Sequence, residues 1–251
     1  MDYVIENVKP SVVVITPTIG KPQLKRAIES VSDQSYKNIL HLIVTDGNEY
    51  WGDVLKHTQI KNQGSNIVLC STPFNTGGSG FYGHRIYAAY PHLVNEDYVA
   101  FLDEDNWFEP NHIASLVEIA QTQKLDFAHS LRKVYIEGKY LADDCCESIG
   151  RWPIAWTPEK QPDYLVDTSS YLFNRKWLIN FCQLWHYGWG GDRMFFKVVK
   201  EIGGYNTTGL HTLNYELPDM NKAYGGQLDI FDKYNTITKE KYGGKYPWEK
   251  T

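Results

Sequence analysis

The sequence predicts an α/β protein built on a parallel, doubly wound sheet with helices on both faces. Two observations lead to this prediction. Short apolar runs rich in β-branched residues alternate with segments of helical period along the first half of the chain, and polar residues follow three of those runs. Such alternation is typical of parallel sheets with right-handed crossovers. The chain has 251 residues, of which 42% are hydrophobic, enough to bury the core of one such domain.

Four strands are expected in the first half of the chain. Each is a continuous apolar run, as expected of strands that are buried on both faces of a parallel sheet. The first run, Val-Val-Val-Ile-Thr, is expected to stop at Pro17. The expected strands are residues 12–16, 40–45, 67–70 and 98–102.

Helices are expected between these strands. Apolar residues recur every three or four positions in each of them, which is the spacing of one helix face. Pro22 suits the first turn of the first helix, where a missing backbone N–H is tolerated. The expected helices cover residues 24–31, about 81–93, and a segment that opens at Pro110.

Beyond about residue 126 the pattern is less regular, and we expect a smaller lobe on the same sheet. No internal repeat, low-complexity tract or linker separates the halves, so residues 1–251 are expected to form a single domain. The tail after Tyr224 is polar. The expected elements are strands at 127–135 and within 164–173, a turn at Glu137-Gly138 into another strand, and helices at 176–184 and 193–202.

The charge and cysteine content exclude several classes of protein. The net charge is −5 and no dense Lys/Arg block occurs, so nucleic-acid binding is not expected as the main activity. No apolar run has the length of a signal peptide or a bilayer span, so we expect a cytoplasmic protein without a transmembrane segment. Four cysteines without metal spacing are expected to be reduced thiols: Cys70, Cys145, Cys146 and Cys182.

Polar residues follow three of the expected strands. These are Thr16-Pro17-Thr18, Asp46-Gly47 and the acidic run Asp103-Glu104-Asp105-Asn106. Parallel sheets bind ligands at the carboxyl ends of their strands. Asp103 and Asp105, two positions apart, can converge on Mg²⁺ or Mn²⁺, which prefer oxygen ligands. A turn, or a cap of the next helix, explains the run alone equally well.

The same segments, in this order, resemble the family-2 glycosyltransferases of the GT-A fold. The resemblance rests on Val-Val-Val-Ile-Thr-Pro-Thr, on a helix that finishes Ser-Val-Ser-Asp-Gln-Ser-Tyr-Lys-Asn, and on the strand ends Leu-Ile-Val-Thr-Asp-Gly and Leu-Asp-Glu-Asp-Asn. It covers roughly residues 11–120. It implies a GT-A domain in which residues 1–125 bind a nucleoside diphosphate sugar and residues 126–251 bind the acceptor and carry the catalytic base.

The resemblance also implies an activity: transfer of a sugar, with inversion, from a nucleoside diphosphate sugar to a hydroxyl acceptor. A UDP-sugar is the favoured donor, a glycan or another hydroxyl compound the acceptor, and Mn²⁺ or Mg²⁺ the cofactor. Two other functions stay open. A sugar nucleotidyltransferase uses a related sheet, although its glycine loop follows the first strand. A non-catalytic nucleotide- or carbohydrate-binding protein could keep the same fold.

Several donor-site residues follow from the resemblance. Pro17, Thr18 and Asp46 match positions that hold the nucleotide, and an Asp can accept hydrogen bonds from uracil or ribose. The family's Asp-x-Asp motif maps onto Asp103 and Asp105. Asp105 is then the better candidate for direct metal coordination, and Asp103 contacts metal or ribose. Glu104 lies between them as a spacer within the donor site, and Asn106 replaces the acid that often follows in the family.

The glycine-rich segment Asn75-Thr76-Gly77-Gly78-Ser79-Gly80 resembles the family's segment before its third helix. Backbone amides around Gly78 could approach a phosphate, and Arg85 could neutralise it. In the alternative interpretation the glycines only shape a turn, and Arg85 lies on a solvated helix face.

The second half is expected to supply the base and the acceptor site. Asp192, in Trp189-Gly190-Gly191-Asp192-Arg193, matches a segment that carries the general base in several inverting GT-A enzymes, although Glu-Asp is more frequent there than Gly-Asp. A helix cap is the alternative. His211 lies where many GT-A enzymes place a late metal ligand, with a structural role as the alternative. Further residues could face an acceptor or only pack: Trp185, His186, Trp189 and Asp167-Thr168-Ser169-Ser170.

Overall fold

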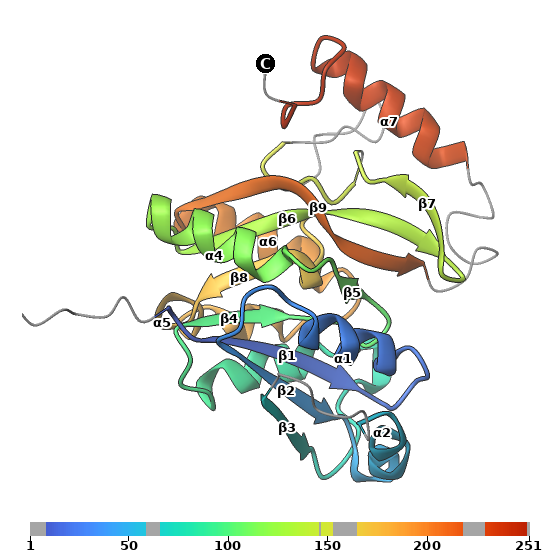
Figure 1. The fold of residues 1–251 in the computed structure, drawn as a ribbon, viewed down its shortest axis with the longest axis vertical. Coiled ribbons are helices and arrows are strands. Elements are labelled where there is room, and N and C mark those ends of the chain that lie inside the picture. The colour runs from blue at the N-terminus through green and yellow to red at the C-terminus, as the bar shows by residue number, and fades with distance from the viewer. Residues whose placement is uncertain (1–8, 59–65, 146, 153–164, 218–228, 250–251) are drawn as a thin grey trace, which may run out of the picture.

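The computed structural model describes residues 9–58, 66–145, 147–152, 165–217 and 229–249. These residues form one nine-stranded sheet in the order β3-β2-β1-β4-β8-β6-β9-β5, with β7 paired to β6 (Figure 1). The expected α/β class is confirmed. The strands are β1 Val12–Thr18, β2 Ile39–Thr45, β3 Asn66–Ser71, β4 Tyr98–Phe101, β5 Trp107–Phe108, β6 Phe127–Ile136, β7 Lys139–Asp143, β8 Tyr171–Asn174 and β9 Tyr205–Leu217.

The sheet is parallel in its first half and mixed in its second. Strand β1 pairs in parallel with β2 and β4, and β2 pairs in parallel with β3. Strand β8 then enters antiparallel between β4 and β6, and β9 runs parallel to β6. The sheet is therefore continuous from the first half of the chain into the second.

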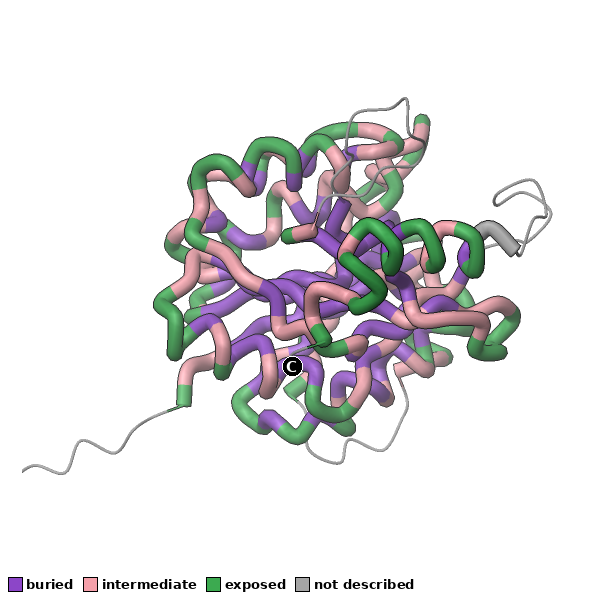
Figure 2. Tube along the Cα trace, turned by 90° about the horizontal axis from the view of Figure 1, so that it is seen from above, coloured by how far each residue is buried: buried purple, intermediate pink, exposed green. Residues whose placement is uncertain are grey.

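Helices cover both faces of the sheet, as expected. Val13 and Ile15 of β1 pack in a core that includes residues of α3 and α6. Val12 and Val14 point to the opposite face, where residues of α1 and α4 cover them. The buried colour of Figure 2 accordingly follows the strands between partly exposed helices. The helices are α1 Leu24–Ser32, α2 Trp51–Thr58, α3 His84–Ala89, α4 His112–Gln123, α5 Arg175–Leu178, α6 Gly191–Ile202 and α7 Asp229–Lys241.

Two expected boundaries are wrong for reasons that involve proline. Strand β1 continues through Pro17 to Thr18, because β4 pairs with β1 only as far as Ile15. Pro17 therefore has a strand on one side only, and its missing N–H breaks no ladder. The helix expected at 81–93 shortens to α3, because Tyr82 has φ 50° and Pro91 opens a separate 3₁₀ turn.

The helix expected at 176–184 is also divided. It consists of α5 and a 3₁₀ turn at Cys182–Trp185. Elements that the sequence pattern did not predict are α2, α7, the two-residue strand β5 and the 13-residue strand β9.

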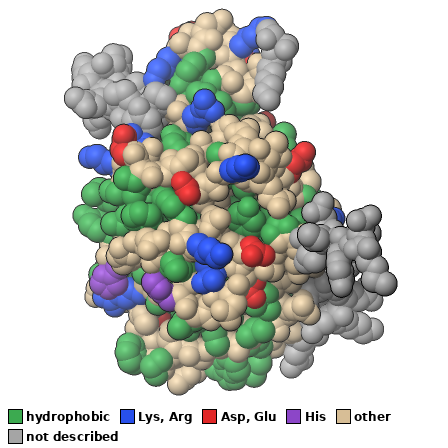
Figure 3. Space-filling model, turned by 90° about the vertical axis from the view of Figure 1, so that its left-hand side faces the viewer, with side chains coloured by type: hydrophobic (Ala, Val, Ile, Leu, Met, Phe, Trp, Pro, Cys, Tyr) green, Lys and Arg blue, Asp and Glu red, His purple; other side chains and the backbone are tan. Residues whose placement is uncertain are grey.

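The distribution of surface charges and the state of the cysteines agree with what the composition predicts. On the face shown in Figure 3, Lys and Arg side chains are spread among acidic and hydrophobic ones. Among the described residues, no helix is both long and apolar enough to cross a membrane. Cys70, Cys145 and Cys182 are free thiols, and Cys146 lies outside the described residues.

Three histidines are buried within the sheet and its covering helices. Burial lowers the pKa of His41 to about 3, of His112 to about 3 and of His129 to about 4. Each ring has one polar partner, such as Thr16 Oγ1 at 2.9 Å from His41 Nε2. The folded protein therefore keeps these rings neutral at pH values where an unfolded chain would protonate them.

We predict that the free energy of unfolding falls as the pH drops below about 6.5, the pKa of histidine in an unfolded chain. The decrease is roughly 1.4 kcal/mol per pH unit for each buried ring. The loss ends only near the folded pKa values of about 3 to 4. His41→Gln should make the decrease between pH 7 and pH 5 smaller, as measured by urea unfolding. The exposed His186→Gln is the control and should leave the decrease unchanged; equal slopes in the two variants would contradict the prediction.

Candidate active site

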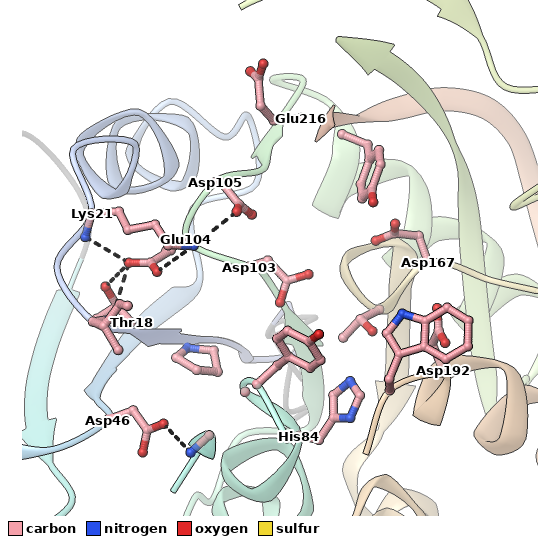
Figure 4. A pocket seen from close by; sticks show the side chains of 18 of the residues that line it. Thr18, Lys21, Asp46, His84, Asp103, Glu104, Asp105, Asp167, Asp192 and Glu216 are labelled. Carbon is pink, nitrogen blue, oxygen red and sulfur yellow. Dashed lines mark hydrogen bonds and ion pairs between the residues drawn. The ribbon is translucent and has the colours of Figure 1, made fainter. Parts of the chain in front are cut away.

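A cavity of about 870 Å³ opens where the carboxyl ends of β1, β2 and β4 meet the second half of the chain. One wall consists of the segments that follow those strands and the glycine-rich segment. The other consists of residues from β6, the segment before β8, the start of α6 and the end of β9 (Figure 4). We call these the strand-end wall and the opposite wall. The sequence predicted the strand-end wall as a ligand site.

Glu104 is more than a spacer in the acidic run. Its carboxylate is buried, and Oε2 accepts hydrogen bonds from Thr18 Oγ1 at 2.6 Å and from the backbone N of Lys21 at 3.1 Å. Lys21 Nζ lies 3.3 Å from Oε1 (Figure 4). Glu104 therefore fixes the loop that follows β1 against the acidic run.

Asp103 is half-buried and lines the centre of the cavity (Figure 4). Tyr87 Oη donates to its Oδ1 at 2.6 Å, and its backbone N donates to Ser169 Oγ at 3.0 Å. Desolvation, together with the carboxylates of Asp105 and Asp167, raises the pKa of Asp103 to about 7, although Tyr87 and Lys21 act in the opposite direction.

Asn106, the departure from the family pattern, both donates and accepts a hydrogen bond, and an ionised acid could only accept. Its Nδ2 donates to Ser169 Oγ at 3.2 Å, and its Oδ1 accepts from the backbone N of Glu216 at 3.0 Å. It is 1% exposed. An ionised carboxylate has no proton to donate, so Asp at this position would lose the first bond and bury another charge.

The acidic run fits a divalent cation in its chemistry. Asp103 and Asp105 offer oxygen ligands, and the mutual repulsion that raises the pKa of Asp103 is what a cation would relieve. Among the described residues, no three His, Cys, Asp or Glu side chains converge on one point. The protein would thus supply few ligands, as is usual for Mg²⁺, which keeps waters and binds substrate phosphates.

His211 does not join these carboxylates. It pairs with Leu131 in the register of β6 and β9, whereas β9 reaches the cavity only at Tyr215, Glu216 and Leu217. Its Nε2 lies 3.4 Å from the carbonyl oxygen of Asp144. The structure therefore places the predicted late metal ligand outside the cavity.

Asp46 organises the glycine-rich segment. Its Oδ1 accepts from the N and Oγ1 of Thr76, both at 2.7 Å, and its Oδ2 accepts from the N of Gly77 at 2.9 Å. A Cβ on Gly77 would lie 2.4 Å from the carbonyl oxygen of Tyr82, so only glycine fits there. Asp46 also lines the cavity, together with Pro17, Thr18 and Gly78.

Arg85 lies behind this segment and does not line the cavity. Its Nη1 donates to the carbonyl oxygen of Thr76 at 3.0 Å, and its guanidinium stacks 3.7 Å from the ring of Phe81. In this position it braces the loop. Contact with a phosphate would require it to leave both partners.

The opposite wall is built around Arg132, which the sequence analysis did not single out. Its guanidinium is 4% exposed and contacts three buried carboxylates: Asp144 at 2.6 Å, Glu147 at 2.8 Å and Asp167 at 2.9 Å. The sequence did contain a signal for this role. Arg132 lies within the largely apolar strand β6, and a buried charge needs partners of opposite charge.

Asp192 lies on the same wall, in the first turn of α6. It lines the cavity, and its Oδ1 accepts from the backbone N of Arg193 at 2.8 Å. The structure thus brings the predicted base into the same cavity as Asp103 and Asp105 (Figure 4).

Of the aromatic residues near Asp192, one is buried in the core and another is accessible from the cavity. Trp185 is fully buried in the core, whereas Trp189 is 78% exposed and lines the cavity. His186 packs its ring 5.3 Å from that of Phe81. Trp189 is therefore the member of the predicted trio that can meet a ligand.

Arg26 of α1 joins the two walls. Its Nη2 donates to the carbonyl oxygen of Asp105 at 2.9 Å and to Glu216 Oε2 at 2.8 Å. Its guanidinium lies 3.5 Å from the ring of Trp107. One side chain thus holds the acidic run against the end of β9.

Comparison with known proteins bears on the chain as a whole. The family described as "Glycosyl transferase family 2" matches residues 11–181, which is more than half of the chain. No curated protein matches the chain.

Similar solved structures include those of S. aureus TarS. Its residues 1–349 in complex with UDP are 12% identical, with a TM-score of 0.57 over 82% of this chain and 60% of that one. The complex with UDP-GlcNAc is 12% identical, with a TM-score of 0.55 over 85% and 61%. This chain thus spans less than two thirds of their length, and at this identity the likeness shows a shared fold.

We predict that Arg26→Met lowers the free energy of unfolding by about 1–2 kcal/mol, because it removes two charge-assisted hydrogen bonds from a partly exposed group. Lys25→Met, next to it on α1, is the control and should change the free energy by less than about 0.5 kcal/mol. Urea unfolding measures both. Equal effects of the two substitutions would show that Arg26 does not brace the acidic run.

Proposed function

The chain belongs to glycosyltransferase family 2, and from this premise we propose that it transfers a sugar from a nucleoside diphosphate sugar to a hydroxyl acceptor, with inversion and with a divalent cation. One observation carries the proposal. The carboxylates of Asp103 and Asp105 and the carboxylate of Asp192 line opposite walls of one cavity. The leaving diphosphate and the attacking acceptor must likewise lie on opposite sides of the anomeric carbon when it is inverted.

The donor is proposed to lie along the strand-end wall. Its nucleotide would contact Pro17, Thr18 and Asp46, which line the cavity at the ends of β1 and β2. Its diphosphate would lie at Asp103 and Asp105. A UDP-sugar is the donor we favour, since the similar TarS structures are described as complexes with UDP and UDP-GlcNAc.

Asp103 and Asp105 would hold Mg²⁺ or Mn²⁺, which stabilises the negative charge that develops on the leaving diphosphate. Glu104 keeps the loop around Thr18 in place beside them. Tyr87 holds one oxygen of Asp103 and so fixes the orientation of that carboxylate.

Asp192 is proposed as the general base. The acceptor hydroxyl oxygen would form a bond to the anomeric carbon while the bond from that carbon to the diphosphate oxygen breaks. The hydroxyl proton would pass to the Asp192 carboxylate. No covalent sugar–enzyme intermediate is then required.

Nucleotide binding tests the donor assignment. We predict that one or more nucleoside diphosphates, UDP first among them, raise the melting temperature, and raise it further with Mn²⁺. A ligand at 100 times its Kd stabilises a protein by about 2.7 kcal/mol. Asp105→Asn should abolish the Mn²⁺-dependent part, whereas the exposed Asp33→Asn should keep it. A thermal-shift series in which no nucleotide stabilises the protein with Mn²⁺ would overturn the proposal.

The base is tested separately from binding. Asp192→Asn should lower the rate of sugar transfer by about 100-fold or more, because general-base catalysis typically contributes that much. The Mn²⁺-dependent thermal stabilisation by nucleoside diphosphate should stay as in the unmodified protein. Asp33→Asn again serves as the control. Unchanged transfer by Asp192→Asn would remove this residue from the mechanism.

A further inference from the structure

Tyr171, the first residue of β8, has a buried hydroxyl that the proposed mechanism does not use. Its side chain is fully buried, and its Oη has no hydrogen-bond partner among the described residues. A buried hydroxyl without a partner lowers the stability of the folded state, so its presence in a native protein requires an explanation.

The sheet places this hydroxyl directly behind the cavity. Strand β8 runs antiparallel to β4, with Leu172 opposite Ala100, so Tyr171 lies at the carboxyl end of β4, where the acidic run begins. The ring of Tyr171 packs against α6. Its centre lies 5.9 Å from the ring centre of Phe195 and 6.4 Å from that of Phe196.

Asp192 lies on the same side of α6. It precedes Phe195 and Phe196 by three and four residues, which is one helical turn. Its charge also acts on the hydroxyl. Burial raises the pKa of Tyr171 most, and the Asp192 carboxylate raises it next, ahead of Asp167. The hydroxyl and the predicted base are therefore neighbours at the boundary between the core and the cavity.

Tyr171 is fixed, whereas Asp192 is able to turn. Asp192 is half-buried and lines the cavity (Figure 4). Its Oδ1 accepts from the backbone N of Arg193, and a carboxylate has about four acceptor sites, so a further donor fits. Five rings surround the ring of Tyr171, those of Phe127, Phe173, Trp185, Phe195 and Phe196.

Asp167, the second carboxylate near the hydroxyl, is held in place. It is buried, and it accepts from Arg132 Nη1 and from the backbone N of Ser169, both at 2.9 Å. Asp192 is therefore the carboxylate that can move onto the hydroxyl of Tyr171.

We propose that Tyr171 is a positioning residue for the base: when the cavity is occupied, its hydroxyl donates a hydrogen bond to the Asp192 carboxylate and holds it toward the attacking oxygen. Catalytic hydrogen bonds often tighten only in the complex with substrate. A donor to the carboxylate also favours the ionised form, which is the form that accepts a proton.

This inference rests on the proposed function, and Tyr171→Phe tests it, because that variant loses one oxygen atom and keeps the ring. Turnover is measured with Mn²⁺ as UDP released from UDP-glucose, UDP-galactose or UDP-N-acetylglucosamine. Water is then the acceptor: its oxygen bonds to the anomeric carbon, the bond to the diphosphate breaks, and a proton passes to Asp192. We expect kcat to fall about tenfold or more, the effect of one hydrogen bond to a charged group. The midpoint of urea unfolding should stay the same or rise.

The pH profile separates this role from a structural one. Without the donor, Asp192 is protonated more easily, so the acidic limb of kcat should move to higher pH by about 1 unit. The other titratable and charged groups around the pair are the same in both proteins, so the difference reports the hydroxyl. Besides Asp167, they are His84, Asp103, His129, Arg132, Arg193 and Tyr205.

Tyr36→Phe is the matched control on the opposite face of the sheet. Tyr36 Oη donates to the carbonyl oxygen of Pro10 at 2.6 Å. Loss of this bond should lower the midpoint of urea unfolding and leave kcat and its pH profile unchanged, which is the reverse of the pattern expected for Tyr171→Phe.

The possible outcomes are distinct. A Tyr171→Phe variant with the kcat and acidic limb of the unmodified protein would overturn the inference and leave the proposed function intact. An equal fold loss from Tyr171→Phe in the Asp192→Asn background would also overturn it, because a positioning residue acts only through the base. If Asp192→Asn releases UDP at the unmodified rate, or the unmodified protein releases none, the proposed function fails and this inference with it. A lower kcat with a shifted acidic limb and undiminished stability would support the inference.

Discussion

The ion cluster of Arg132 is the interaction on which the cavity depends. A buried guanidinium costs free energy to desolvate, and three carboxylates compensate it here. These partners come from the segment after β7 and the segment before β8, which have no regular secondary structure of their own. Arg132, held in the middle of β6, therefore gives both segments a fixed position. Without it, three buried carboxylates would repel one another at the same point.

Hydrogen bonds extend this cluster to the strand-end wall. Asp167 accepts from Arg132 through Oδ2 and from the N of Ser169 through Oδ1. Ser169 Oγ in turn accepts from the N of Asp103 and from Asn106 Nδ2. The orientation of the predicted metal-binding aspartate is thus coupled to a charge on the opposite wall. Preorganised groups of this kind need not reorganise during a reaction, which is a large part of how enzymes stabilise transition states.

The fold and the strand-end residues could be predicted from sequence because both depend on local signals. Apolar runs and the residues directly after them identify the strands and their carboxyl ends. The contacts of Glu104, Ser169 and Arg26 could not be predicted in this way, because their partners lie far away in the chain and are set by the register of the sheet. His211 illustrates this: its position in β9 faces Leu131 and not the cavity. Strand β9 itself was missed because its half-buried Thr, Asn and Gly residues interrupt the apolar alternation.

The carboxylates of the cavity are compensated differently at its two walls. At the strand-end wall, desolvation and the carboxylates of Asp105 and Asp167 disfavour the ionised state of Asp103, and a divalent cation would relieve the repulsion. On the opposite wall, Asp144, Glu147 and Asp167 contact the guanidinium of Arg132. Carboxylates are thus compensated by a cationic side chain at one wall, whereas a bound cation would compensate them at the other.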